Sequence, residues 1–189
     1  SLLSKDFAKE VNKLGKNSKS KASEMEHAIR RHIKVNINKD PALYKRFLKR
    51  MEEILERYQG NWDAIVEAFE KVRADLEKGR KGDNEEEGLN EQELPFYDFI
   101  NFSVFQDENI SEEEKVALKA LTVELVKTLQ EATNKPNFWK GRAAEIRKLQ
   151  GEVEDLISFS NLEKVSKMHA KLSVELMNLA KRRHQELTK

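Results

Sequence analysis

Apolar side chains recur at the three- and four-residue spacing of amphipathic helices along most of the chain. The pattern is clearest after Asp40 and Pro41, since an Asp followed by a Pro is a typical helix start. An apolar stripe follows at a helical period, and Gly60 is expected to end this helix. Asn61 is expected to cap the next helix, whose stripe runs to about Leu76.

Five further segments show helical signals. Capping-box spacing marks three of their starts: Ser23 with Glu26, Asn90 with Glu93, and Ser111 with Glu114. The aromatic helix that starts near Pro95 is expected to end after Phe102. Two more helices are expected over about residues 138–157 and 162–187. No segment predicts a strand. The sequence therefore predicts an all-α fold, a single helical domain of about seven helices with no sheet.

The expected helical domain covers residues 21–189. Residues 1–20 are expected to form a flexible basic arm or linker, because Gly15 interrupts a weak helical pattern and a polar, basic stretch follows. An exposed acidic loop is expected at residues 79–90, where Gly and acidic residues gather. The chain begins with Ser rather than Met, so we interpret it as a segment of a longer polypeptide.

Composition narrows the class of protein. Charged residues make up 37% of the chain and Cys is absent, which excludes disulfides and thiolate metal sites and fits a reducing compartment. No apolar stretch approaches the roughly 18 residues of a membrane span, so no membrane partner is expected. The net charge of +1 divides into +7 over residues 1–60, −10 over 61–135 and +4 over 136–189. Basic ends favour either a polyanionic partner or docking onto the acidic middle.

Sequence signatures of catalysis are missing. The chain contains no phosphate-binding GxxxxGK[ST] loop and no GxGxxG, GxSxG or HExxH motif. Glu24 and His27 have the spacing of a carboxylate-bridged metal site, but such a site needs a second pair, which is absent. His27 and His32 are therefore expected at the edge of the core. We expect no catalytic residue, no metal site and no cofactor in this chain, and hence no enzyme activity of its own.

Basic side chains gather on several predicted helices. One run, at residues 45–50, places Lys or Arg at three- and four-residue steps, which predicts a continuous cationic strip. Such strips suit DNA phosphates, which supply affinity without sequence readout. The residues proposed for DNA contact are Arg30, Arg31, Lys34, Arg142, Arg147, Lys148 and Arg183. For any single strip, compensation of a helix dipole or an ordinary surface ion pair is the simpler explanation.

Aromatic residues supply the candidates for protein docking. Phe96, Tyr97 and Trp139 are proposed for this role if part of each is exposed. The aromatic stretch at residues 96–105 lies among apolar neighbours and is not interleaved with Lys or Arg, so a core position is the favoured interpretation for it.

Several segments resemble one family when taken in order. They are SEMEHAIRRHI, KDPALYKRFLKRMEEILE, NWDAIVEAFEKV, GLNEQELPFYDFI and NFWKGRAAEIRKLQGEVEDLI. Together they resemble the C-terminal region of the motor subunit of type I restriction enzymes, over about residues 23–157. Residues 160–189 match less well, and a Tyr-Pro element typical of many relatives is absent after Ile157. The chain is therefore expected to belong to a divergent subfamily.

The resemblance implies a bacterial, cytoplasmic protein. Subunits of this family carry a nuclease domain and two helicase lobes upstream, where ATP and Mg are expected. They bind a methyltransferase core of modification and specificity subunits and move double-stranded DNA. The resemblance thus implies a non-catalytic domain for complex assembly and non-specific DNA contact during translocation and cleavage. The alternative is a structural cap that packs on the helicase and helical domains without touching DNA.

Overall fold

A computed structural model describes residues 17–80 and 88–189. Within these ranges the chain forms nine α-helices and no strand, which confirms the predicted all-α fold. The chain divides into two compact units, Ser1–Lys81 and Gly82–Lys189. Each unit has its own hydrophobic cluster, whereas the sequence analysis expected one helical domain.

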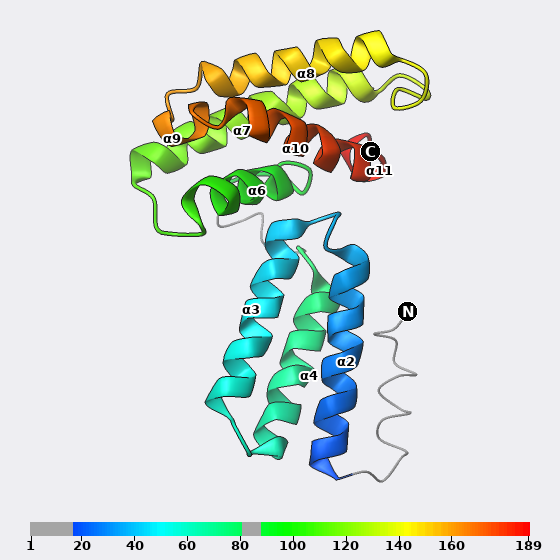
Figure 1. Ribbon diagram of the computed structural model, residues 1–189, viewed down its shortest axis with the longest axis vertical. Coiled ribbons are helices and arrows are strands. Elements are labelled where there is room, and N and C mark those ends of the chain that lie inside the picture. The colour runs from blue at the N-terminus through cyan, green and yellow to red at the C-terminus, as the bar shows by residue number, and fades with distance from the viewer. Residues whose placement is uncertain (1–16, 81–87) are drawn as a thin grey trace. The chain divides into compact units, whose positions relative to one another are not determined.

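The first unit is a bundle of three helices. Helices α2 (Ser18–Asn36), α3 (Pro41–Arg57) and α4 (Trp62–Lys78) run up, down and up, side by side (Figure 1). Their apolar stripes meet in one cluster. Its most deeply buried members are Ile29, Ile33, Met51, Ile65, Phe69 and Val72. This packing is the expected outcome for amphipathic helices of similar length joined by short turns.

Helix α2 begins earlier than expected. Its cap is Asn17, whose side chain accepts a hydrogen bond from the Ser20 backbone N–H at 3.0 Å. The capping-box pair that begins at Ser23 therefore lies inside the helix, and the end of the proposed arm is helical. The rest of that arm, residues 1–16, lies outside the described residues, as do residues 81–87 of the expected acidic loop. Leu89, at the end of that loop, is buried rather than exposed.

The starts of α3 and α4 follow the predicted caps. The Asp40 side chain accepts a hydrogen bond from the Leu43 N–H at 3.3 Å, and Asn61 accepts one from the Ala64 N–H at 3.2 Å. Gly60 ends the preceding turn with φ +80°, a conformation that favours glycine.

Asp40 also forms a buried ion pair. Its carboxylate accepts hydrogen bonds from Nε of Arg80 at 2.6 Å and from Nη2 at 2.8 Å. The two side chains are only 6% and 10% exposed. The pair therefore links the start of α3 to the residues that follow α4. Because both side chains are buried, water screens their charges little.

The second unit contains the remaining helices. They are α6 (Leu94–Phe105), α7 (Glu112–Thr133), α8 (Ala143–Ser158), α9 (Glu163–Ser166), α10 (His169–Arg182) and α11 (His184–Leu187). Helices α7 and α8 form an antiparallel pair (Figure 1). Helix α10 packs against α8 and α6, and α11 packs against α7. The predicted capping box of Ser111 and Glu114 is present at the start of α7.

Three boundaries in this unit differ from the sequence analysis. Helix α8 starts at Ala143 rather than near residue 138, because Asn137 (φ +56°) and Gly141 (φ +83°) turn the chain while Phe138 is buried. Helix α6 continues past Phe102 to Phe105. The single helix expected over 162–187 is divided into α9, α10 and α11. The described residues therefore form nine helices where about seven were expected.

The C-terminal tail belongs to the core of this unit. Leu172 and Leu176 of α10 are fully buried and Leu179 is 1% exposed, all in the same cluster as α7 and α8. Residues 160–189, for which the sequence suggested no role, therefore cover the inner faces of α8 and α6.

The ion pair of Asp40 predicts a large effect on stability. Asp40→Ala removes the cap of α3, worth about 1 kcal/mol, and leaves the Arg80 charge buried without this carboxylate, which costs about 3–5 kcal/mol. We expect the free energy of unfolding of the first unit to fall by about 4–6 kcal/mol. The measurement is a urea titration followed by Trp62 fluorescence in a Trp139→Phe background.

The matched control for that variant is Glu67→Ala. It breaks the ion pair with Lys71, whose side chains are 73% and 68% exposed. Because exposed pairs contribute about 0–1 kcal/mol, this variant should unfold close to the parent. An equal loss in the two variants would show that the buried pair does not stabilise the unit.

A second prediction concerns the tail. Leu176→Ala leaves a cavity in the core, and we expect it to lower the free energy of unfolding of the second unit by about 2–5 kcal/mol. Val174→Ala is the control, because Val174 lies on the same helix but is 46% exposed. Trp139 fluorescence in a Trp62→Phe background reports the transition. If both variants unfold like the parent, the tail is not a structural part of the unit.

Candidate functional site

Charge is divided between the two units. The first unit, Ser1–Lys81, has 20 Lys and Arg against 13 Asp and Glu, a net charge of +7. The second unit, Gly82–Lys189, has 15 against 21, a net charge of −6. The near-neutral total therefore conceals one cationic and one anionic unit, which attract partners of opposite sign.

Two of the proposed DNA-contact residues lie on the solvent face of α2. Arg31 and Lys34 are exposed, and His27, one turn before Arg31, is exposed on the same face. Within the described part of the chain, Arg31 and Lys34 have no carboxylate partner. Arg30 differs, because its Nε donates to the Glu26 carboxylate at 2.8 Å. The structure thus leaves a short cationic stripe of Arg31 and Lys34 open to solvent.

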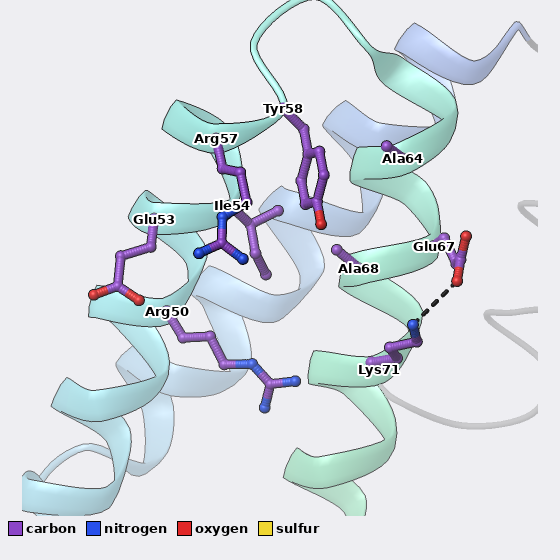
Figure 2. Close-up of a pocket in the computed structure, with 9 residues that line it drawn as sticks. All are labelled: Arg50, Glu53, Ile54, Arg57, Tyr58, Ala64, Glu67, Ala68 and Lys71. Carbon is purple, nitrogen blue, oxygen red and sulfur yellow. Dashed lines mark hydrogen bonds and ion pairs between the residues drawn. The ribbon is translucent and has the colours of Figure 1, made fainter.

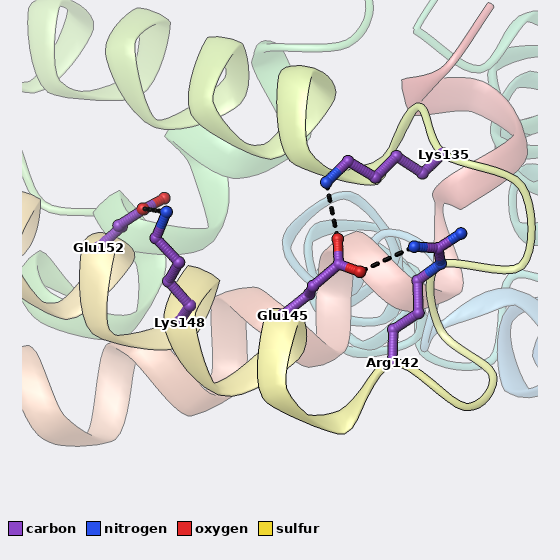
Figure 3. A network of polar contacts seen from close by, with 5 residues as sticks. All are labelled: Lys135, Arg142, Glu145, Lys148 and Glu152. Carbon is purple, nitrogen blue, oxygen red and sulfur yellow. Dashed lines mark hydrogen bonds and ion pairs between the residues drawn. The ribbon is translucent and has the colours of Figure 1, made fainter.

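The second proposed group lies at the start of α8. Arg142 donates to Glu145 at 2.7 Å, and Lys135 donates to the other oxygen of the same carboxylate at 2.7 Å (Figure 3). Lys148 lies 3.6 Å from the Glu152 carboxylate. Hydrogen bonds from Lys135 and then Arg142 hold the pKa of Glu145 below its usual range. These cations are therefore partly neutralised by their neighbours.

The remaining DNA-contact candidates are Arg147 and Arg183. Arg147 is exposed, next to Lys148 on α8, and has no ion pair within the described ranges. Arg183 is half-buried at the turn between α10 and α11. The structure brings Arg142, Arg147 and Lys148 together on the anionic unit, while Arg30, Arg31 and Lys34 belong to the cationic unit. The DNA role of all seven residues stays a prediction.

The docking candidates are buried to different extents. Phe96 is 0% and Tyr97 4% exposed, both inside the cluster of the second unit. They therefore form core rather than a docking surface. Trp139 is half-buried, with its ring perpendicular to that of Phe138 at 5.1 Å between centroids. Its indole Nε1 is buried and finds no hydrogen-bond partner among residues 17–80 and 88–189.

A groove lies between α3 and α4, and the sequence did not predict it. It has a volume of about 550 Å³ and is lined by Arg50, Arg57, Lys71 and two glutamates, around Tyr58 and Ile54 (Figure 2). Lys71 pairs with Glu67 at 3.0 Å, and Arg50 pairs with Asp75. Arg57 has no ion pair in the described residues. The seven-residue spacing of Arg50 and Arg57 puts both on one face of α3, which is the only sequence signal of this groove.

The histidines are placed differently from each other. His32 is half-buried, with its ring 6.0 Å from that of Tyr44, and this burial lowers its pKa. His27 is exposed, so it does not lie at the edge of the core as expected.

In the described ranges no three His, Cys, Asp or Glu side chains are grouped as a metal site requires. Nor does any described helix combine the length and the apolar content needed to cross a bilayer.

These features define a helical protein with separate cationic and anionic units. Over residues 1–156 the sequence matches the family described as type I restriction enzyme HindI endonuclease subunit-like, C-terminal. The chain belongs to this family, as the ordered segments of its sequence predicted. The match covers the first unit and continues into α8, so α9, α10 and α11 lie beyond it. No curated protein and no solved structure matches the chain.

Burial of His32 predicts a pH dependence of stability. Because the pKa of His32 is lowered in the folded state, the unfolded chain binds this proton first as the pH falls. The free energy of unfolding of the first unit should therefore be highest above the ordinary His pKa of 6.5 and decline as the pH falls through it toward the lower folded-state pKa. Urea titrations at pH values between about 7.5 and 5.5 measure this decline.

His32→Gln removes the titrating group and should flatten the profile over that range. His27→Gln is the control, since the exposed His27 should leave the decline in place. A decline that is equally steep in both variants would assign the pH dependence to other groups.

Proposed function

We propose that this chain is a non-catalytic C-terminal domain of a type I restriction enzyme subunit, with one unit for DNA and one for assembly. The first unit contacts double-stranded DNA without sequence preference. The second docks onto a methyltransferase core of modification and specificity subunits. The observation that carries the proposal is the division of charge, +7 on one unit and −6 on the other, in a member of this family.

The DNA contact is best supported at Arg31 and Lys34. Their side chains are exposed and, within the described residues, are not held by carboxylates. A cation that neutralises a phosphate releases a condensed counterion, which favours binding at low salt. A flat helical stripe of this kind positions DNA rather than reading its bases. Contact of this type suits DNA that moves past the protein.

Assembly is supported by the second unit. A net charge of −6 favours encounter with a basic protein surface and disfavours contact with DNA. We assign ATP hydrolysis and DNA cleavage to other parts of the parent subunit, because this sequence carries no phosphate-binding loop.

The alternative of a structural cap has support of its own. Three of the proposed DNA-contact residues, Arg30, Arg142 and Lys148, face carboxylates of the same unit. In a structural cap every charged face is merely solvated, and removing exposed cations changes no interaction with DNA.

DNA binding across a salt series separates the two functions. The measurement is fluorescence anisotropy of a labelled 30-base-pair duplex with the 189-residue chain, between about 50 and 200 mM salt. Arg31→Gln with Lys34→Gln removes two proposed phosphate contacts. We expect weaker binding and a loss of about 2 from the slope of log K against log salt, since each contact contributes about 0.9.

The matched control is Lys167→Gln with Lys171→Gln. This double variant removes the same charge from the second unit, where Lys167 pairs with Glu163 and Lys171 lies 4.0 Å from Glu175. Its salt slope should equal that of the parent. Equal slopes for all three proteins, or no binding by the parent, would favour the structural cap.

A further inference from the structure

The second unit carries a groove between α7 and α8. This α7–α8 groove has a volume of about 750 Å³ and is formed by one face of α7, the C-terminal half of α8 and the turn at residues 159–161. It belongs to a single unit, so its shape depends only on the packing of that antiparallel pair. From Ala117 to Glu131, at 1.5 Å per residue, the α7 wall is roughly 20 Å long.

The floor of the α7–α8 groove is apolar. Ala117, Ala120 and Leu121 contribute apolar side chains from α7, and Leu156 contributes one from α8. Phe159, at the end of α8, also lines the groove and is 82% exposed. An aromatic ring left in water at the mouth of an apolar groove is a typical anchor for a protein partner.

The rim of the α7–α8 groove is acidic. Glu124 and Glu131 line it from α7, and Glu152 and Asp155 from α8. No Lys or Arg is among its lining residues. Lys148 approaches Glu152 to 3.6 Å and neutralises part of that one charge. The groove thus offers apolar contact in the middle and negative charge along the sides.

We propose that the α7–α8 groove binds a basic amphipathic helix of a partner subunit. Such a helix places apolar side chains on the floor every three or four residues and Lys or Arg against the rim carboxylates. The wall fits a helix of about four turns. DNA and a second copy of this unit are disfavoured, because either would bring negative charge onto the acidic rim.

This inference rests on the proposed assembly function and makes it more specific. It also goes beyond the family match, which ends at residue 156, before Phe159 and the turn that completes the groove.

The test measures binding of the full 189-residue chain to the purified core of modification and specificity subunits by biolayer interferometry. We expect Phe159→Ala to weaken binding about tenfold, as truncation of an interface anchor does. Glu124→Gln with Asp155→Asn should weaken binding and reduce its salt dependence. Circular dichroism establishes that each variant remains folded.

The control for the charge variant is Glu112→Gln with Glu163→Gln. These carboxylates are 84% and 80% exposed and lie outside the groove, so the same loss of charge should leave binding unchanged. Labelled 18-residue peptides that tile the core subunits provide a second probe. The peptides that bind the parent chain, and not the Phe159→Ala variant, should be basic and amphipathic.

Each of the remaining outcomes would contradict the proposed groove or the proposed assembly function. If the parent binds the core and all variants bind equally, the groove is not the docking site, although the proposed function stands. If the parent does not bind, the assembly role fails and this inference fails with it. A dimer in analytical ultracentrifugation that Phe159→Ala abolishes would instead assign the groove to a second copy of the chain.

Discussion

The buried apolar side chains collect in two clusters with no member in common. One cluster joins α2, α3 and α4, and the other joins α6 to α11, so each helix is stabilised by partners within its own unit. The first unit has a further constraint in Asp40, which caps α3 and pairs with Arg80. Because each unit has its own core, each can present a surface to a different partner.

The charge pattern can be interpreted only when the chain is divided into these two units. Along the sequence it runs from positive to negative to positive, which favoured either a polyanionic partner or docking of the basic ends onto the acidic middle. In the structure the boundary after Lys81 places an excess of cations in one unit and an excess of anions in the other. Arg142 and Lys148 face Glu145 and Glu152, whereas Arg31, Lys34 and Arg147 are exposed with no ion pair in the described residues. Of these three, only Arg31 and Lys34 belong to the cationic unit, so ion pairing together with the net charge of the unit separates the candidates for DNA contact.

Features that depend on neighbouring residues were predictable from the sequence. The caps at Asp40, Asn61 and Ser111 are confirmed, since each involves a hydrogen bond three residues away. The late start of α8 was not predictable, because it follows from burial of Phe138 and two positive φ angles. Nor was the ion pair of Asp40 with a residue forty positions later, or the α7–α8 groove, whose walls come from two helices. Tertiary packing decides such features, and no local pattern encodes them.

The end of the family match falls inside a helix rather than between units. It stops at residue 156, within α8, and leaves out α10, whose Leu172 and Leu176 are fully buried against the shared part. A chain that ended at the match would lack α10 and would expose apolar side chains of α8, whose buried residues before the end of the match include Leu149 and Val153. Any relative that keeps the α7–α8 pair therefore needs its own cover for those side chains, either from its chain or from a partner. In this protein the tail supplies the cover, and the same turn that leads into it places Phe159 at the mouth of the acidic groove.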